Sequence, residues 1–176
     1  MRTREQKEGN NRHWGLLEGG GWETEEEQKK RIATLFDLNN IRNNNIAALT
    51  RLKELQQSDG SWAWYKGMNG SRFITNFIVE LNARLALLTG KPLEGDALTM
   101  QRSAFSFLNK EALEEYKNIR KAEKNGTKID NLSYPAMTYL YLIAISGERV
   151  PSANEAAYRY FLSMVGKNLS SNAMGV

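Results

Sequence analysis

The sequence predicts an all-α protein built from antiparallel helical hairpins, and three observations lead to this fold class. Apolar residues recur every three or four positions through most of the chain, which is the period of an amphipathic helix. Glycine, proline and helix-capping residues separate these stretches. Two similar segments, each with an apolar helix end, a glycine, a short turn and an aromatic helix, are centred on Gly90 and Gly147. Such a repeat is typical of stacked helical hairpins.

Residues 1–21 are polar and end in three consecutive glycines, which predicts a flexible arm. His13, the sole histidine, has no sequence neighbours suited to a metal or acid–base role. The hairpin array is expected to occupy residues 22–176.

The first two helices are predicted on either side of an asparagine-rich stretch. Thr24 and Glu27 have the spacing of a capping box, so a helix is expected over about 25–37. Helical spacing resumes at Ile46 and is expected to end near Gln57, before a tight Ser-Asp-Gly turn.

The two middle helices also begin at capping residues. Ser71 is predicted to cap a helix over about 72–88. Asp96 is predicted to cap the next, which ends at the Asn-Gly pair 125–126, and its apolar stripe permits a break near Asn109.

The last two helices are predicted from Ser133 to Gly147 and from a Ser152–Glu155 capping box to Gly166. The first of these is apolar nearly all round, so it is expected to be buried. The large side chains of the second are expected to cover more than one face and to favour self-association or packing against following helices. These side chains are Tyr158, Tyr160, Phe161 and Met164.

Composition narrows the function classes. The formal net charge is +4, but acids and bases alternate along the chain, so no nucleic-acid partner is expected. The absence of cysteine excludes disulfides, thiolate metal sites and a cysteine nucleophile, and no cofactor or metal is expected. No apolar run reaches the ~18–20 residues of a membrane span, and the first residues do not resemble a signal peptide.

The most informative stretch covers residues 52–76, where three aromatic residues follow a tight turn. Each such ring buries roughly 150–250 Å² when it packs, so the loop must fold back onto the protein. We expect this loop to be structural rather than catalytic. The motif consists of Gln56, Asp59, Gly60, Trp62, Trp64 and Tyr65.

The spacing Gln56-x-x-x-Gly60-x-Trp62 matches the Gln-Trp motif of alpha/alpha-toroid proteins. The longer segment LKELQQSDGSWAWYKGMNGSRFIT resembles the thioester-type helical domain of bacterial alpha-2-macroglobulins, and the resemblance covers about residues 22–90. It implies part of an alpha/alpha toroid in a larger protein of the bacterial cell envelope or periplasm. The implied role is non-enzymatic: the trapping or inhibition of proteases. Because the family's thioester needs a cysteine, capture here would be by steric enclosure.

Two other functions stay open. Asp59, flanked by aromatic rings, would suit a toroid enzyme acting on carbohydrate or isoprenoid substrates, with Glu80 or Asp96 as a second carboxylate. The second of these hypotheses is a generic helical protein-interaction module. The polar residues after the aromatic loop would either line a pocket or cap and brace the helix, and the second role is the commoner. They are Ser71, Arg72, Thr75 and Asn76.

Overall fold

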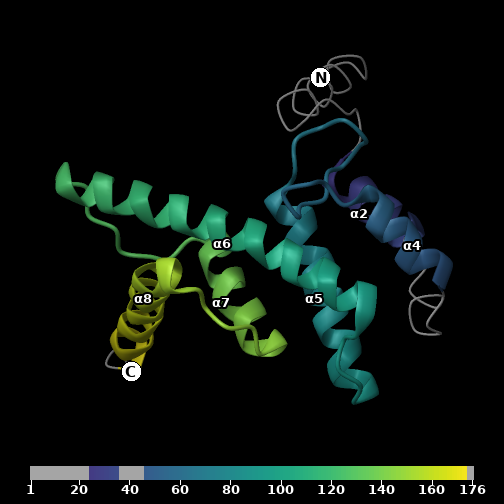
Figure 1. Ribbon diagram of the computed structural model, residues 1–176. Helices are drawn as coiled ribbons and strands as arrows, with labels where there is room; N and C mark the ends of the chain where they lie inside the picture. The colour runs from purple at the N-terminus through teal and green to yellow at the C-terminus, as the bar shows by residue number, and fades with distance from the viewer. Residues whose placement is uncertain (1–23, 36–45, 174–176) are drawn as a thin grey trace, which may run out of the picture. The chain divides into compact units, whose positions relative to one another are not determined.

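The computed structural model describes residues 24–35 and 46–173, and these residues are helical apart from their connections (Figure 1). Within these ranges the β-structure is a single bridge between Trp62 and Ser71. The prediction of an all-α fold is therefore confirmed, whereas a toroid arrangement stays a prediction. The helices are α2 (Glu25–Leu35), α4 (Ile46–Leu55), α5 (Arg72–Thr89), α6 (Gly95–Lys124), α7 (Tyr134–Ser146), the 3-10 turn η1 (Ser152–Asn154) and α8 (Glu155–Ala173).

The chain divides into two compact units. The first comprises residues 1–55 and 63–69, and the second comprises residues 56–62 and 70–176. In the first unit, Thr24 and Glu27 form the predicted capping box at the start of α2. The Thr24 amide donates to Glu27 Oε2 at 2.9 Å, and the Glu27 amide donates to Thr24 Oγ1 at 3.3 Å. The boundary predicted at residue 21 lies outside the described residues.

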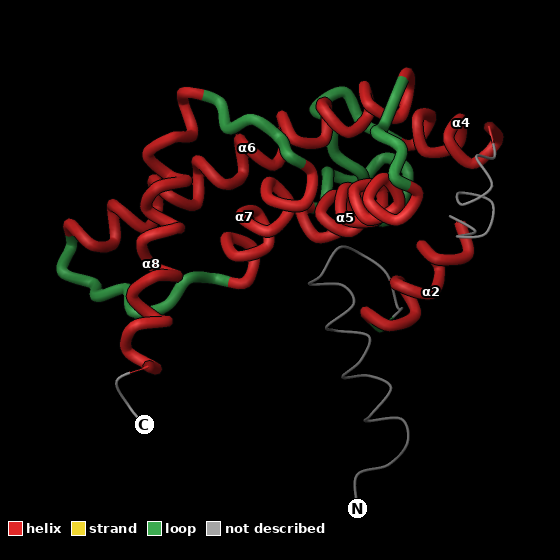
Figure 2. The backbone as a smooth tube through the Cα atoms, turned by 90° about the horizontal axis from the view of Figure 1, so that it is seen from below, coloured by secondary structure: helices red, strands yellow, loops and turns green. Residues whose placement is uncertain are grey.

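The second unit is organised around α6, the longest helix. Helices α5, α7 and α8 follow one another along it, and each packs on its neighbour as well as on α6 (Figures 1 and 2). Where α6, α7 and α8 meet, the Phe161 ring packs edge to face against Tyr116 and Tyr139, with centroid distances of 6.5 and 6.4 Å, respectively. The hydrophobic core of this unit thus lies along one side of α6.

Two predicted caps are confirmed. The Ser71 hydroxyl accepts a hydrogen bond from the Ile74 amide at 3.3 Å, and α5 begins at the next residue. The Ser133 hydroxyl does the same for the Ala136 amide at 3.2 Å at the start of α7. Both helices end at a glycine in the left-handed conformation, as the sequence predicts.

The predicted cap and break of α6 are wrong. Glu94 occupies the N-cap position without a capping hydrogen bond from its side chain, and Asp96 lies in the first turn. The helix runs without interruption from Gly95 to Lys124. Asn109 does not break it because the Asn109 side chain is engaged by another helix: its Oδ1 accepts a 2.6 Å hydrogen bond from the Tyr139 hydroxyl. Tertiary packing therefore outweighs the weak helix propensity of asparagine.

The last two helices also differ from the sequence predictions. Helix α7 buries Tyr139 and Leu142 but leaves Tyr134 71% exposed, so it is not buried all round. Residues 152–154 form the 3-10 turn η1 instead of a simple capping box. Helix α8 continues through Gly166 to Ala173.

The expected exposed aromatic face of α8 is largely absent. Phe161 and Met164 are buried, and Tyr158 and Tyr160 are half-buried. The exposed apolar residues of this helix are instead Leu162 and Leu169. These four residues therefore do not offer the exposed apolar surface on which the predicted self-association depended.

Candidate functional site

The Gln56–Trp62 turn is held by bonds within itself. The Gln57 amide donates to the Ser61 carbonyl at 2.8 Å, and the Gly60 amide donates to the Gln57 carbonyl at 2.9 Å. Asp59 Oδ1 accepts from the Ser61 amide at 3.0 Å and from the Ser61 hydroxyl at 2.5 Å. Asp59 therefore acts as a turn residue whose carboxylate satisfies neighbouring donors.

Gln56 fastens this turn to α6. Its Nε2 group donates to the Gly60 carbonyl and to the Met100 carbonyl, each at 2.9 Å. Gly60 itself has φ +90°, and a Cβ placed there would lie 1.9 Å from the backbone oxygen of Ser103 in α6. Because a side chain would be both strained and obstructed at this point, the close approach of the turn to α6 requires glycine.

Trp62 joins the same turn to α5. The residue is 2% exposed, its amide donates to Thr75 Oγ1 at 3.0 Å, and its carbonyl accepts from the Ser71 amide at 2.8 Å. The Thr75 hydroxyl in turn donates to the Ser71 carbonyl at 2.8 Å. A buried ring and two hydrogen bonds of the Trp62 main chain, one to a side chain and one to a main-chain amide, thus hold the turn at the N-terminus of α5.

The structure brings four of the six motif residues together: Gln56, Asp59, Gly60 and Trp62 all belong to the second unit. Trp64 and Tyr65 belong to the first unit, where both side chains are half-buried. Of the two carboxylates considered as partners for Asp59, Glu80 is paired with Arg84 at 2.8 Å. Asp96 lies exposed in the first turn of α6.

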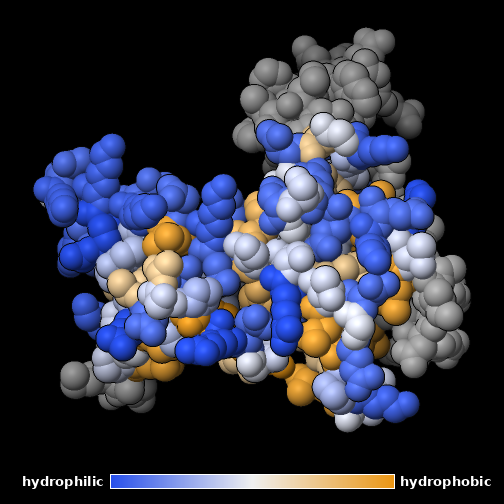
Figure 3. All heavy atoms as spheres, viewed as in Figure 1, coloured by the Kyte–Doolittle hydropathy of each residue, from blue (hydrophilic) through white to orange (hydrophobic). Residues whose placement is uncertain are grey.

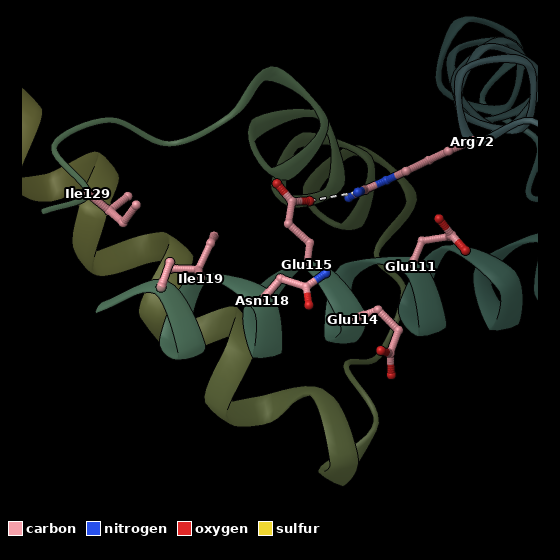
Figure 4. Close-up of a pocket in the computed structure, with 8 residues that line it drawn as sticks. Arg72, Glu111, Glu114, Glu115, Asn118, Ile119 and Ile129 are labelled. Atoms are coloured by element: carbon pink, nitrogen blue, oxygen red, sulfur yellow. Dashed lines mark hydrogen bonds and ion pairs between the residues drawn. The ribbon is translucent and has the colours of Figure 1, made fainter. Parts of the chain in front are cut away.

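A second polar cluster joins three helices and was only partly foreseen (Figure 4). Arg72 Nη1 at the start of α5 pairs with Glu115 Oε2 of α6 at 2.6 Å, and both side chains are less than a fifth exposed. Arg72 Nη2 also donates to the Pro135 carbonyl of α7 at 3.3 Å. The Ser133 hydroxyl donates to the second oxygen of Glu115. The sequence pattern around Arg72 does not predict this partner, because Glu115 lies 43 positions further on.

Arg72 and Glu115 also line a pocket of about 450 Å³ along α6 (Figure 4). Its acidic side chains are Glu111, Glu114 and Glu115, and Ile119 and Ile129 close its other end. The Arg72 and Glu115 charges neutralise each other, so the pocket offers acceptors rather than a reactive group. Among the described residues, no group of three or more metal-ligating side chains is assembled.

A buried network supports the junction of α6, α7 and η1. The Tyr139 hydroxyl donates to Asn109 Oδ1, and Asn154 Nδ2 donates to the Asn109 backbone carbonyl at 2.7 Å. Burial raises the pKa of Tyr139 to about 12 because the phenolate would be desolvated there. Tyr139 is thus a neutral hydrogen-bond donor at ordinary pH, and no local sequence signal links it to residues 109 and 154.

No protein-family model matches the chain, and comparison with characterised proteins and with solved structures likewise gives no significant match. The resemblance to bacterial alpha-2-macroglobulins therefore depends on the sequence pattern alone. In the part of the chain that the structure describes, no helix is long and apolar enough to cross a membrane.

Proposed function

We propose that the chain is a non-catalytic helical domain of an alpha-2-macroglobulin-like protein of the cell envelope, and that it contributes to protease trapping without a thioester. The sequence pattern of residues 52–75 supports the family. A domain in this role needs a rigid helical surface rather than a reactive group, and its partners would be the other domains of the protein and the trapped protease.

The non-catalytic part of this proposal is supported by one observation: the motif residues are buried or engaged in hydrogen bonds within the protein. The Trp62 ring is 2% exposed, so it cannot stack on a sugar ring in solvent. One oxygen of Asp59 already accepts two hydrogen bonds from Ser61. Gln56 uses its amide group to join the turn to α6. These residues thus do structural work that explains their presence without a substrate.

Steric enclosure makes a testable prediction about substrate size. A protease incubated with the full-length protein should keep its activity on a small chromogenic peptide and lose activity on a large protein substrate. Mass spectrometry should show no covalent adduct, because the chain has no cysteine to form a thioester. Equal activity on both substrates, with and without the protein, would contradict the trapping function.

A control addresses the carbohydrate or isoprenoid enzyme. Asp59→Asn retains an acceptor for the Ser61 donors and removes the charge that acid catalysis needs. We expect this variant to trap proteases as the parent does. A glycosidase or cyclase activity that Asp59→Asn abolished would show that the non-catalytic assignment is wrong.

A further inference from the structure

The basic residues of α6 all lie on one exposed face. A helix advances by about 100° per residue, so positions 102, 110, 117, 120, 121 and 124 fall within a sector of roughly 100°. These are all the lysines and arginines of α6, and every one of them is exposed. We name this surface the basic face: Arg102, Lys110, Lys117, Arg120, Lys121 and Lys124.

The glutamates of the same helix are turned to other directions. Glu115 pairs with Arg72, and Glu123 accepts a 2.7 Å hydrogen bond from the Tyr160 hydroxyl. Glu111 and Glu114 contribute to the acidic pocket at one edge of the basic face. Acids and bases that alternate in the sequence therefore occupy different sectors of the helix and form ion pairs where these sectors meet. Figure 3 shows strongly hydrophilic residues gathered over the free end of α6.

The positive charge of the basic face is only partly neutralised. Lys117 pairs with Glu114 at 2.9 Å and Arg120 with Glu123 at 2.8 Å. Lys110, Lys121 and Lys124 form no ion pair with the described residues, so their ammonium groups are available to an external anion. A helix C-terminus favours cations in its last turn, which accounts for Lys121 and Lys124 but not for Lys110, three turns earlier.

The basic face also has a groove rather than a flat surface. A hollow of about 440 Å³ is lined by four of its cations and by the ring of Tyr116. Arg120 lies over the neighbouring ring of Tyr160, 5.9 Å from its centroid, which orders the guanidinium beside the groove.

We propose that the basic face binds an acidic amphipathic helix of a partner protein. From Lys110 to Lys124 it extends about 21 Å at 1.5 Å per residue, and its width is roughly that of one helix, 10–12 Å. The lysines at 110, 117, 121 and 124 are spaced by seven, four and three residues, so carboxylates at the same spacing on a partner helix would face them.

Two other polyanions fit this face less well. A nucleic-acid duplex is wider than one helix, and it would place phosphates over Glu111 and Glu114 at the edge of the face. An anionic membrane surface is usually bound with apolar side chains inserted beside the cations. Among the described residues, none of the large exposed hydrophobic side chains belongs to α6, so the basic face has no apolar side chain of this kind to insert.

A direct binding experiment tests the proposal. The probe is a fluorescently labelled 21-residue helical peptide with glutamate at positions spaced seven, four and three apart, and its control carries glutamine at those positions. We expect saturable binding of the glutamate peptide by fluorescence anisotropy, at least tenfold tighter than the glutamine peptide. The affinity should fall at least tenfold between 0.05 M and 0.5 M salt, since surface charges are screened over ~10 Å at 0.1 M.

Two triple variants with equal change in net charge locate the site. Lys117→Glu, Lys121→Glu and Lys124→Glu together should weaken binding at least tenfold. A matched variant with Lys91→Glu, Lys128→Glu and Lys167→Glu, three exposed lysines outside α6, should leave it within twofold of the parent. If the first variant loses helical circular dichroism, the corresponding Lys→Gln variant, which adds no acidic charge to the end of α6, replaces it.

Several results would overturn the proposal. The first is no binding of the glutamate peptide, and the second is an equal loss of binding in both triple variants. The third is tighter binding of another anion than of the peptide: a 21-nucleotide DNA would reassign the basic face to nucleic acid, and phosphatidylglycerol vesicles would reassign it to a membrane surface.

Discussion

Replacing Gln56 with glutamate is the most specific perturbation of the Gln56–Trp62 turn, which is hydrogen-bonded to both α5 and α6. Glutamate has the same shape as glutamine but no N–H groups. Both hydrogen bonds from Gln56, to the Gly60 and Met100 carbonyls at 2.9 Å, are therefore lost in Gln56→Glu. The introduced carboxylate also faces two carbonyl oxygens instead of donors.

The expected cost follows from these contacts. A typical hydrogen bond contributes about 0.5–1.5 kcal/mol to the free energy of unfolding, so the loss of two costs about 1–3 kcal/mol. Gln56→Met removes the same donors without adding charge and serves as the matched control. The half-buried carboxylate should add about 1 kcal/mol or more in Gln56→Glu at pH 7.

The pH dependence of the free energy of unfolding separates the cost of the lost hydrogen bonds from the cost of the introduced charge. The carbonyl oxygens favour the protonated carboxyl, which donates a hydrogen bond, so the pKa of the introduced group should be raised in the folded state. A raised folded-state pKa gives stability that is present below the unfolded value of about 4.3 and is lost as the pH rises through the folded value. Gln56→Glu should therefore be closer to the parent at pH 4 than at pH 7, whereas the cost of Gln56→Met should be nearly the same at both.

Urea unfolding followed by circular dichroism at the two pH values measures all three proteins. Each variant is compared with the parent at the same pH, so that titration of the native carboxylates cancels. A Gln56→Glu protein as stable as the parent at pH 7 would refute the role assigned to the Gln56 amide.

Three further predictions concern the same unit. Trp62→Ala should lower the free energy of unfolding by about 3–5 kcal/mol, since the ring is buried, and a thermal melt resembling that of the parent would contradict this. Gly60→Ala should cost more than 1 kcal/mol, because φ is +90° and a Cβ would meet the Ser103 carbonyl; an unchanged urea midpoint would show that the turn does not approach α6. Tyr139→Phe should cost about 1–3 kcal/mol by leaving Asn109 Oδ1 without its donor. Because burial raises the pKa of Tyr139 from about 10 to about 12, the parent should lose stability as the pH rises from 10 to 12, and Tyr139→Phe should lose less over this range in the same urea assay.

The helix starts that depend on neighbouring residues were predictable from the sequence. Ser71 and Ser133 bond to amides three residues later, and Thr24 with Glu27 forms a local capping box. Such bonds are determined by spacing within one turn, so a sequence pattern contains the information needed. Glycines 90 and 147 were assigned as helix ends for the same reason.

The continuity of α6 was not predictable locally. Asn109 lowers helix propensity, and the residue that engages its side chain, Tyr139, lies 30 positions away. The Arg72–Glu115 pair likewise spans 43 positions. Long-range partners decide both features, and neither leaves a periodic pattern in the sequence.

The separation of charges on α6 also depends on the continuity of the helix. Lys110 and Glu111 are adjacent in the chain. On the helix they lie about 100° apart, so one contributes to the acidic pocket and the other to the basic face. The angular separation of these charges therefore follows from the continuity of α6.

Native-state hydrogen exchange tests the central claim that the Gln56–Trp62 turn is a structural junction. The amides of Trp62 and Ser71 donate to Thr75 Oγ1 and to the Trp62 carbonyl, respectively. If the turn opens only when the helical unit unfolds, both amides should exchange as slowly as the amide of buried Ile78 in α5. Exchange of Trp62 and Ser71 at the rate of an exposed loop, with Ile78 still protected, would contradict the account.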